Sequence, residues 1–306
     1  MKKTAPHPTP AVDLYQKVTD RIIAALENGT VPWHKPWSAY GLPLNYFSRH
    51  IYQGINSLML EFGDYEYPFW ATFRQVSAAG GYIRKGAKAD QVYFFKYLFW
   101  DEQGRQIGPE QAQCLMDNGT AIKRKRYIQY SCVFNVADFM GIEVNLPQLP
   151  AHSPTERAER FLQELPEQPK IAHAQKDRAS YSLALDQINM PYLRQFDSTA
   201  EYYSTLFHEL IHWTGNANRL NRLEPGCKFE SEPYGKEELV AEIGASFLCA
   251  LTGIQRSETE ANSAAYLQCW ITKLKGDKEL IFQAASAARK AVAFLAPKTD
   301  AFAVVE

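Results

Sequence analysis

Apolar positions near the start of the chain repeat with the spacing of a helix. Leu14, Val18, Ile22 and Leu26 recur every four residues, so one face of a helix would be apolar. An Asn-Gly pair, which is typical of a helix end, follows directly. The pattern therefore predicts a helix over residues 12–28.

Further along the first half, two segments have the composition of strands and lack this helical spacing. Segments 91–100 and 126–135 are dominated by β-branched and aromatic residues, which predicts a strand in each. The segment 101–125 between them is polar and irregular, and we expect it to form a mobile loop.

A proline-rich stretch at 146–154 is typical of a linker and predicts two domains, residues 1–145 and residues 155–306. Helical spacing dominates beyond it, with Ser198 as an expected N-cap and Gly215 as an expected stop. The elements predicted there are a short helix at 155–165, short strands at 170–173 and 179–188, and helices at 198–214, at 236–251 and twice within 258–295. The fold class is therefore α+β, with an α+β first domain and a mostly helical second domain that contains a small sheet.

Composition agrees with a globular protein. The 306 residues are 46% hydrophobic and 22% charged, and no apolar run approaches the roughly 20 residues that span a bilayer. The first ten residues lack the apolar stretch of a secretory signal. Five cysteines without a Cys-x-x-Cys pair favour reduced thiols. We therefore expect a cytoplasmic protein with no membrane partner.

Candidate metal chemistry lies in the predicted helix 198–214, which contains His208-Glu209-Leu210-Ile211-His212. Residues four apart lie on one helix face, so His208 and His212 can present two imidazoles to one metal ion. Glu209 is placed to accept a proton from a metal-bound water, as the general base of a hydrolytic zinc site. The simpler alternative is a pair of helix histidines without a metal.

A third ligand is expected from the helix 236–251. Glu238 and Glu242 are again four apart, and a catalytic zinc takes three protein ligands and one open position. We expect Glu238 to bind the metal and Glu242 to orient a histidine, although the reverse assignment is nearly as good. Glu237 is expected to face solvent, and His173 is a further candidate ligand. Two imidazoles and a carboxylate favour Zn²⁺, with Mn²⁺ or Co²⁺ as alternatives.

Several segments of the second half resemble the metallopeptidase half of ArdC-type plasmid antirestriction proteins: 202–215 with Arg219-Leu220, 237–249 and 266–295. The resemblance implies a gluzincin-like zinc metallopeptidase domain. Segment 186–191 is similar to the lead-in of this family. In related zinc peptidases such a strand borders the cleft and can pair with an extended peptide.

The first half resembles the same family at 32–37, 52–58, 70–73, 80–86 and 133–137. In that family this half is the domain that binds single-stranded DNA. Aromatic rings that stack on bases, together with cations that follow the phosphates, hold single strands. Residues 74–126 carry ten basic and five acidic side chains. The candidate DNA-binding residues are Trp33, Trp37, Tyr46, Tyr52, Asn56, Arg84, Lys85, Lys88, Lys123, Arg124, Lys125 and Arg126.

Alternatives remain open for these residues. Most aromatic side chains of a small domain must fill its core, Asn56 could close a turn, and the run 123–126 could be a solvated turn. The resemblance implies an antirestriction protein that protects incoming mobile-element DNA. One alternative is a metalloprotease that cleaves a host restriction protein or another host protein, with the first domain positioning the target. The other is a single-stranded-DNA-binding protein whose metal is structural.

Overall fold

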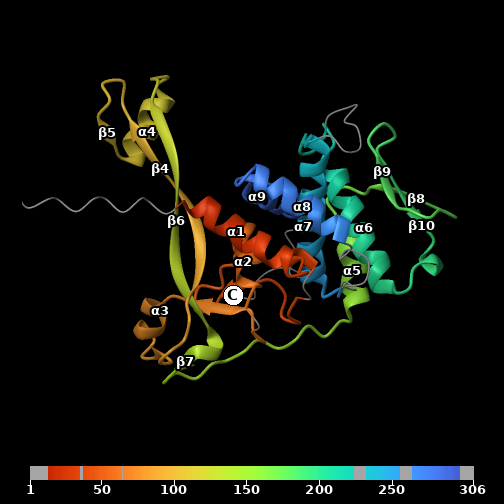
Figure 1. The fold of residues 1–306 in the computed structure, drawn as a ribbon, viewed down its shortest axis with the longest axis horizontal. Coiled ribbons are helices and arrows are strands. Elements are labelled where there is room, and N and C mark those ends of the chain that lie inside the picture. Colours follow the sequence, from red (N-terminus) through yellow and green to blue (C-terminus); the bar gives the residue numbers. More distant parts are fainter. Residues whose placement is uncertain (1–12, 35–36, 64, 224–231, 256–263, 297–306) are drawn as a thin grey trace, which may run out of the picture.

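The computed structural model describes residues 13–34, 37–63, 65–223, 232–255 and 264–296 (Figure 1). Its first helix is α1 (Leu14–Glu27). The carboxylate of Asp13 caps it by accepting hydrogen bonds from the backbone N–H groups of Tyr15 and Gln16. The helix buries the apolar face that its sequence spacing predicts, so this prediction is confirmed.

A five-stranded sheet in the order β1-β2-β6-β4-β5 forms the centre of the first half. Its strands are β1 (Leu44–Asn45), β2 (Phe69–Ala71), β4 (Asp90–Trp100), β5 (Gln106–Ile107) and β6 (Lys123–Asn135). The smaller elements around it are η1 (Pro32–His34), α2 (Ile55–Leu60), α3 (Phe73–Ala78), β3 (Tyr82–Ile83), η2 (Val136–Asp138) and β7 (Phe139–Met140).

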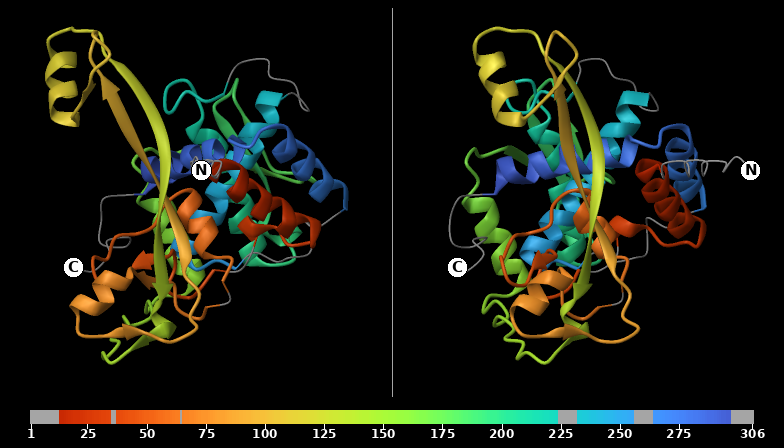
Figure 2. Two further views of the ribbon diagram at one scale, coloured as in Figure 1. Left: turned by 60° about the vertical axis from the view of Figure 1, so that its left-hand side comes forward. Right: turned by 90° about the vertical axis from the view of Figure 1, so that its left-hand side faces the viewer.

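Strands β4 and β6 pair antiparallel over their shared length, from Asp90 opposite Val133 to Trp100 opposite Lys123. Their outer part carries β5 and α4 (Pro109–Asp117) at its tip and reaches away from the helical body (Figures 1 and 2). We call this protrusion, residues 94–129, the arm.

The predicted mobile loop at 101–125 is wrong, because this segment contains β5, α4 and the first residues of β6. Pro109 stands in the first turn of α4, where its missing N–H costs nothing, and Ala112 is buried against the arm. Strand β6 begins three residues earlier than predicted because Lys123, Arg124 and Lys125 pair with β4. Cross-strand pairing of this kind overrides a polar local sequence.

Helices dominate the second half, as predicted, and the α+β fold class is confirmed. The helices are α5 (Pro154–Gln163), α6 (Thr199–Thr214), α7 (Glu232–Thr252), α8 (Ala264–Gly276) and α9 (Leu280–Leu295), with a short turn η3 (Leu193–Gln195). A three-stranded sheet in the order β8-β10-β9 consists of β8 (Lys170–Ala174), β9 (Ser180–Ser182) and β10 (Gln187–Pro191). Of the described helices, none is both long and apolar enough to cross a membrane.

The main hydrophobic core does not divide at the proline-rich stretch 146–154. It joins residues of α1, η1 and α2, among them Val18, Trp33 and Leu58, to the buried faces of α6, α7, α8 and α9. Smaller clusters around Phe69 and Trp70 serve the central sheet. The first part of the chain therefore packs as an integral layer on the helices of the second half, and the domain limits at 145 and 155 stay a prediction.

Candidate metal centre

Helix α6 begins at its predicted cap, where the hydroxyl of Ser198 accepts a hydrogen bond from the N–H of Glu201, and it ends at Gly215. Leu210 and Ile211 are fully buried on the core side of this helix. A Cβ on Gly244 of α7 would lie 2.7 Å from the side chain of Ile211. Only glycine therefore allows α7 to pass α6 so closely, and this approach brings the carboxylates of α7 against the histidines of α6.

Three side chains converge between these helices. The Nε2 atoms of His208 and His212 lie 3.1 Å apart. One carboxylate oxygen of Glu238 lies 3.5 Å from Nε2 of His208, and the other lies 3.4 Å from Nε2 of His212. The possible ligand atoms of these three residues lie within 4.8 Å of one another. All three side chains keep some solvent exposure, which leaves room for the open position of a catalytic metal.

The other nitrogen of each histidine faces a different carboxylate of α7. Nδ1 of His212 lies 3.4 Å from Oε1 of Glu237, and Nδ1 of His208 lies 3.7 Å from Oε1 of Glu242. Such outer carboxylates fix the orientation of metal-binding imidazoles. Glu238 therefore lies where a ligand is needed, and Glu242 lies where a carboxylate can orient a histidine.

Glu237 was expected to face solvent, and this prediction is wrong. The residue is only 7% exposed, because α7 is also buried on the side that carries Glu237. The guanidinium of Arg222 donates hydrogen bonds of 2.9 Å and 3.1 Å to the two oxygens of Glu237. This ion pair offsets the cost of burying the carboxylate.

The ionisable groups of the centre shift one another's pKa values. Burial acts to lower the pKa of His212, but hydrogen bonds to Glu237 and Glu238 outweigh burial and raise this pKa to about 10. Burial opposes ionisation of Glu238, yet its hydrogen bonds with His208 and His212 keep the pKa of its carboxyl group well below the usual range. The pKa of Glu237 is also lowered, because hydrogen bonds from His212 and Arg222 outweigh its burial. The centre therefore holds a protonated imidazole of His212 among ionised carboxylates, and binding of a metal ion to that imidazole would release its proton.

The remaining candidates for the centre are also placed. Glu209 is buried beside His208 on α6. His173 is not part of the cluster, and it shares a 2.9 Å hydrogen bond with the hydroxyl of Tyr202. Strand β10, expected to pair with an extended peptide, is instead the central strand of its sheet and pairs with β8 and β9. Within this sheet only β8 and β9 are edge strands.

The four aromatic residues expected to stack on DNA are buried. Trp33 is 0% exposed, Trp37 6%, Tyr46 9% and Tyr52 8%. These rings fill hydrophobic clusters and offer no free face to a base, so their expected stacking role is contradicted. Asn56 also has a structural partner, because its side-chain amide exchanges two hydrogen bonds with the backbone of Tyr93 in β4.

The basic candidates are exposed. Arg84 forms an ion pair with Asp138, and Lys85 and Lys88 lie on the surface nearby. Lys123, Arg124, Lys125 and Arg126 are exposed along the arm. Tyr97, Phe99 and Trp100 of β4 lie opposite this run, and Phe95 lies next to it, opposite Ile128. In the sequence these aromatic residues predict only a strand. Aromatic residues of one strand lie opposite cations of the other, and this pairing is the signal that could have identified these aromatic residues as candidates for DNA binding.

Comparison with known proteins agrees with both halves of the chain. Residues 156–287 match the model of a zincin-like metallopeptidase family, and residues 12–134 match the N-terminal domain of anti-restriction factor ArdC. The metal-free crystal structure of the antirestriction ArdC protein from the R388 plasmid is similar to this chain. The two sequences are 36% identical, and the structures superpose with a TM-score of 0.72 over 93% of this chain and 97% of that one. The Mn(II)-bound form is 35% identical, with a TM-score of 0.70 over the same shares.

Further relatives share the same region. A DNA primase TraC from Escherichia coli is 35% identical over 285 residues, which is 90% of this chain but 26% of that protein. The chain thus spans about a quarter of the length of that relative. Protein y4eC of Sinorhizobium fredii is 32% identical over 92% of this chain and 91% of its own length. Fold and site define a protein with a zincin-like metallopeptidase region at 156–287, preceded at 12–134 by a region of the ArdC N-terminal type. The chain belongs to the ArdC family of antirestriction proteins.

Proposed function

We propose that this protein binds single-stranded DNA on the arm and thereby protects incoming mobile-element DNA from host restriction in the cytoplasm. The observation that carries the proposal is the row of four exposed cations, residues 123–126. They pair with Trp100, Phe99, Leu98 and Tyr97 of β4, so three of the four lie opposite an aromatic residue. The arm also reaches away from the helical body, so a long polymer has access to both of its faces (Figure 2).

The face of the arm toward α9, which we call the inner face, carries three aromatic rings and two arginines. Phe95 and Tyr97 are 38% and 45% exposed, and Tyr97 stacks on Phe99 with ring centroids 6.2 Å apart. The guanidinium of Arg126 lies 4.6 Å from the ring of Phe95, and that of Arg124 lies 5.9 Å from the ring of Tyr97. A groove of about 590 Å³ separates this face from α9. Bases can stack in it while the guanidinium groups contact phosphates.

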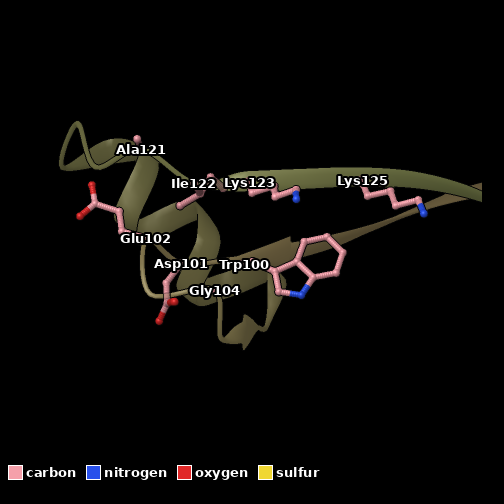
Figure 3. Close-up of a pocket in the computed structure, with 8 residues that line it drawn as sticks. All are labelled: Trp100, Asp101, Glu102, Gly104, Ala121, Ile122, Lys123 and Lys125. Carbon is pink, nitrogen blue, oxygen red and sulfur yellow. The ribbon is translucent and has the colours of Figure 1, made fainter.

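The opposite face, which we call the outer face, carries a second combination of an aromatic ring and cations. Trp100, Lys123 and Lys125 line a cavity of about 950 Å³, together with the carboxylates of Asp101 and Glu102 (Figure 3). Trp100 is directly opposite Lys123 in the strand pairing, so indole and ammonium share one face. Stacking and cation contacts are therefore available on both faces of the arm.

Binding to strands of mixed sequence tests this function directly. We expect tighter binding to single-stranded than to double-stranded DNA, with an affinity that falls as salt rises. The variant K123A/R124A/K125A/R126A should lose most of this binding. The variant K170A/K176A/R178A/R194A, which removes the same charge elsewhere, should retain it. Equal affinity for both forms of DNA would contradict the proposal.

The metal centre is the second part of the proposed function. We propose that His208, His212 and Glu238 bind a divalent ion, Zn²⁺ in the first place and Mn²⁺ or Co²⁺ as alternatives, and the Mn(II)-bound relative supports such a site. A bound ion supplies Lewis acidity and lowers the pKa of a coordinated water. Glu209 is the carboxylate that would accept the proton, and Glu237 and Glu242 would orient the imidazoles.

The buried position of Glu209 beside the ligands favours a second candidate function, cleavage of a host protein. The variant Glu209→Ala removes the proposed base and keeps the three ligands, so its metal content should equal that of the wild type. If this variant still protects DNA, hydrolysis is not required and DNA binding alone accounts for the protection. Loss of protection in the folded, metal-loaded variant would instead show that hydrolysis is required.

A further inference from the structure

Glu242 is held by a residue from the other end of the chain. Nε2 of His34, in η1, lies 2.8 Å from Oε2 of Glu242, and both side chains are largely buried. The carboxylate accepts this hydrogen bond, so the imidazole donates it. The second oxygen of Glu242 faces Nδ1 of His208. A continuous chain of contacts therefore leads from His34 through Glu242 to a proposed metal ligand.

His34 is itself firmly placed. Its backbone N–H donates a 2.9 Å hydrogen bond to the carbonyl of Val31, and its ring stacks on Tyr266 of α8 with centroids 6.0 Å apart. The neighbouring Trp33 is fully buried and packs edge-to-face on Trp270. Because η1 is anchored among the helices of the second half, His34 can hold a fixed direction of hydrogen bonding.

The arrangement repeats the one around the second histidine. Glu237 faces Nδ1 of His212 and is held from behind by Arg222. Glu242 faces Nδ1 of His208 and is held from behind by His34. Each imidazole thus has one outer carboxylate, and each carboxylate has its own donor.

We propose that His34 is a positioning residue of the metal centre, which holds Glu242 in the orientation that aligns the imidazole of His208. The inference rests on the metal ligation proposed above. Outer partners of metal-binding histidines fix the ring and raise its basicity, and losing one typically weakens metal affinity by about 10–100-fold. Residue 34 falls in the region that matches the N-terminal family model, whereas Glu242 falls in the metallopeptidase region. The first region therefore supplies part of the centre of the second.

The test is the Zn²⁺ affinity of the full-length protein, measured by competition with a chromophoric chelator. H34A should bind Zn²⁺ about 10–100-fold more weakly than the wild type. H34Q keeps an N–H donor and should stay within a few-fold of the wild type, and it also covers the case in which H34A does not fold.

A matched control separates positioning from packing. Trp37 donates a 2.9 Å hydrogen bond from its indole N–H to Ser246 of α7, one turn beyond Glu242. W37F removes this second anchor of the same segment, and it should lower thermal stability without changing the Zn²⁺ affinity. Unchanged affinity in H34A, or equal loss in H34A and W37F, would overturn the proposal. H208A separates failure of the His34 proposal from failure of the proposed metal ligation. A wild-type Zn²⁺ affinity in H208A would mean that the proposed ligand set is wrong.

Discussion

Arg124 and Arg126 on the inner face of the arm offer a quantitative test of the proposed DNA-binding surface. Each cation that neutralises a phosphate of a single strand contributes about 0.7 to the slope of log affinity against log salt concentration. Two lost contacts should therefore reduce the slope by about 1.4 in the variant R124A/R126A. Arg126 also lies 3.8 Å from Glu279, so part of its charge is already compensated. The expected reduction accordingly lies between about 0.7 and 1.4.

The assay is fluorescence anisotropy of a labelled single strand, titrated at several salt concentrations. With the full reduction, a fourfold rise in salt weakens binding of the wild type about sevenfold more than binding of R124A/R126A. The pair on the outer face, K123A/K125A, should reduce the slope less, because Asp101 and Glu102 line the same cavity and already compensate part of this charge. The control pair K176A/R178A removes the same charge from an exposed segment outside the arm. An unchanged slope in R124A/R126A, or an equal reduction in the control, would refute the reasoning.

Three further variants test the stacking, packing and charge arguments. Tyr97→Ala should weaken single-strand binding by the value of one stacked base, about 1–3 kcal/mol, whereas Tyr97→Phe should bind like the wild type in the same anisotropy assay. Gly244→Ala should destabilise the fold by about 1–3 kcal/mol in urea unfolding, because its Cβ would meet Ile211, and adding Ile211→Val should recover part of the loss. Asp186 has a lowered pKa, chiefly because it accepts hydrogen bonds from Arg219, so it stabilises the folded state above its unfolded pKa. This contribution should disappear as pH falls through the folded pKa, and Asp186→Asn should flatten that part of a stability profile measured by urea unfolding.

Local sequence pattern was sufficient to predict helices such as α1 and α6 and part of the metal centre. The four-residue spacing in α1 and the cap and stop of α6 depend on neighbours in sequence, and the structure forms both. The spacing of His208 and His212 likewise places two imidazoles on one face whatever surrounds them. These features could be predicted because their physical cause is local.

Features that depend on distant contacts could not be predicted in this way. Glu237 reads as a solvent-facing position until Arg222 is seen to bind it, and His34 has no sequence signal that links it to Glu242. Trp33 and Trp37 are rings beside a basic region, and only tertiary packing shows that they fill the core.

The arm is a second region whose surface could not be predicted from local sequence. Phe95 and Tyr97 have the composition of a buried strand, yet both are exposed because no second layer covers them completely. The cations at residues 123–126 acquire their aromatic partners only through the register of β4 and β6. The proposed DNA-binding surface therefore depends on strand pairing, which the linear sequence pattern does not specify.

Recovery of unmodified plasmid DNA that enters a restricting host by conjugation tests the central claim most directly. The chain should be expressed as wild type, as K123A/R124A/K125A/R126A and as the charge-matched control K170A/K176A/R178A/R194A, with protein levels compared. The account predicts that the wild type and the control raise recovery, whereas the arm variant gives no more than an empty vector. An arm variant that protects as well as the wild type would contradict the account.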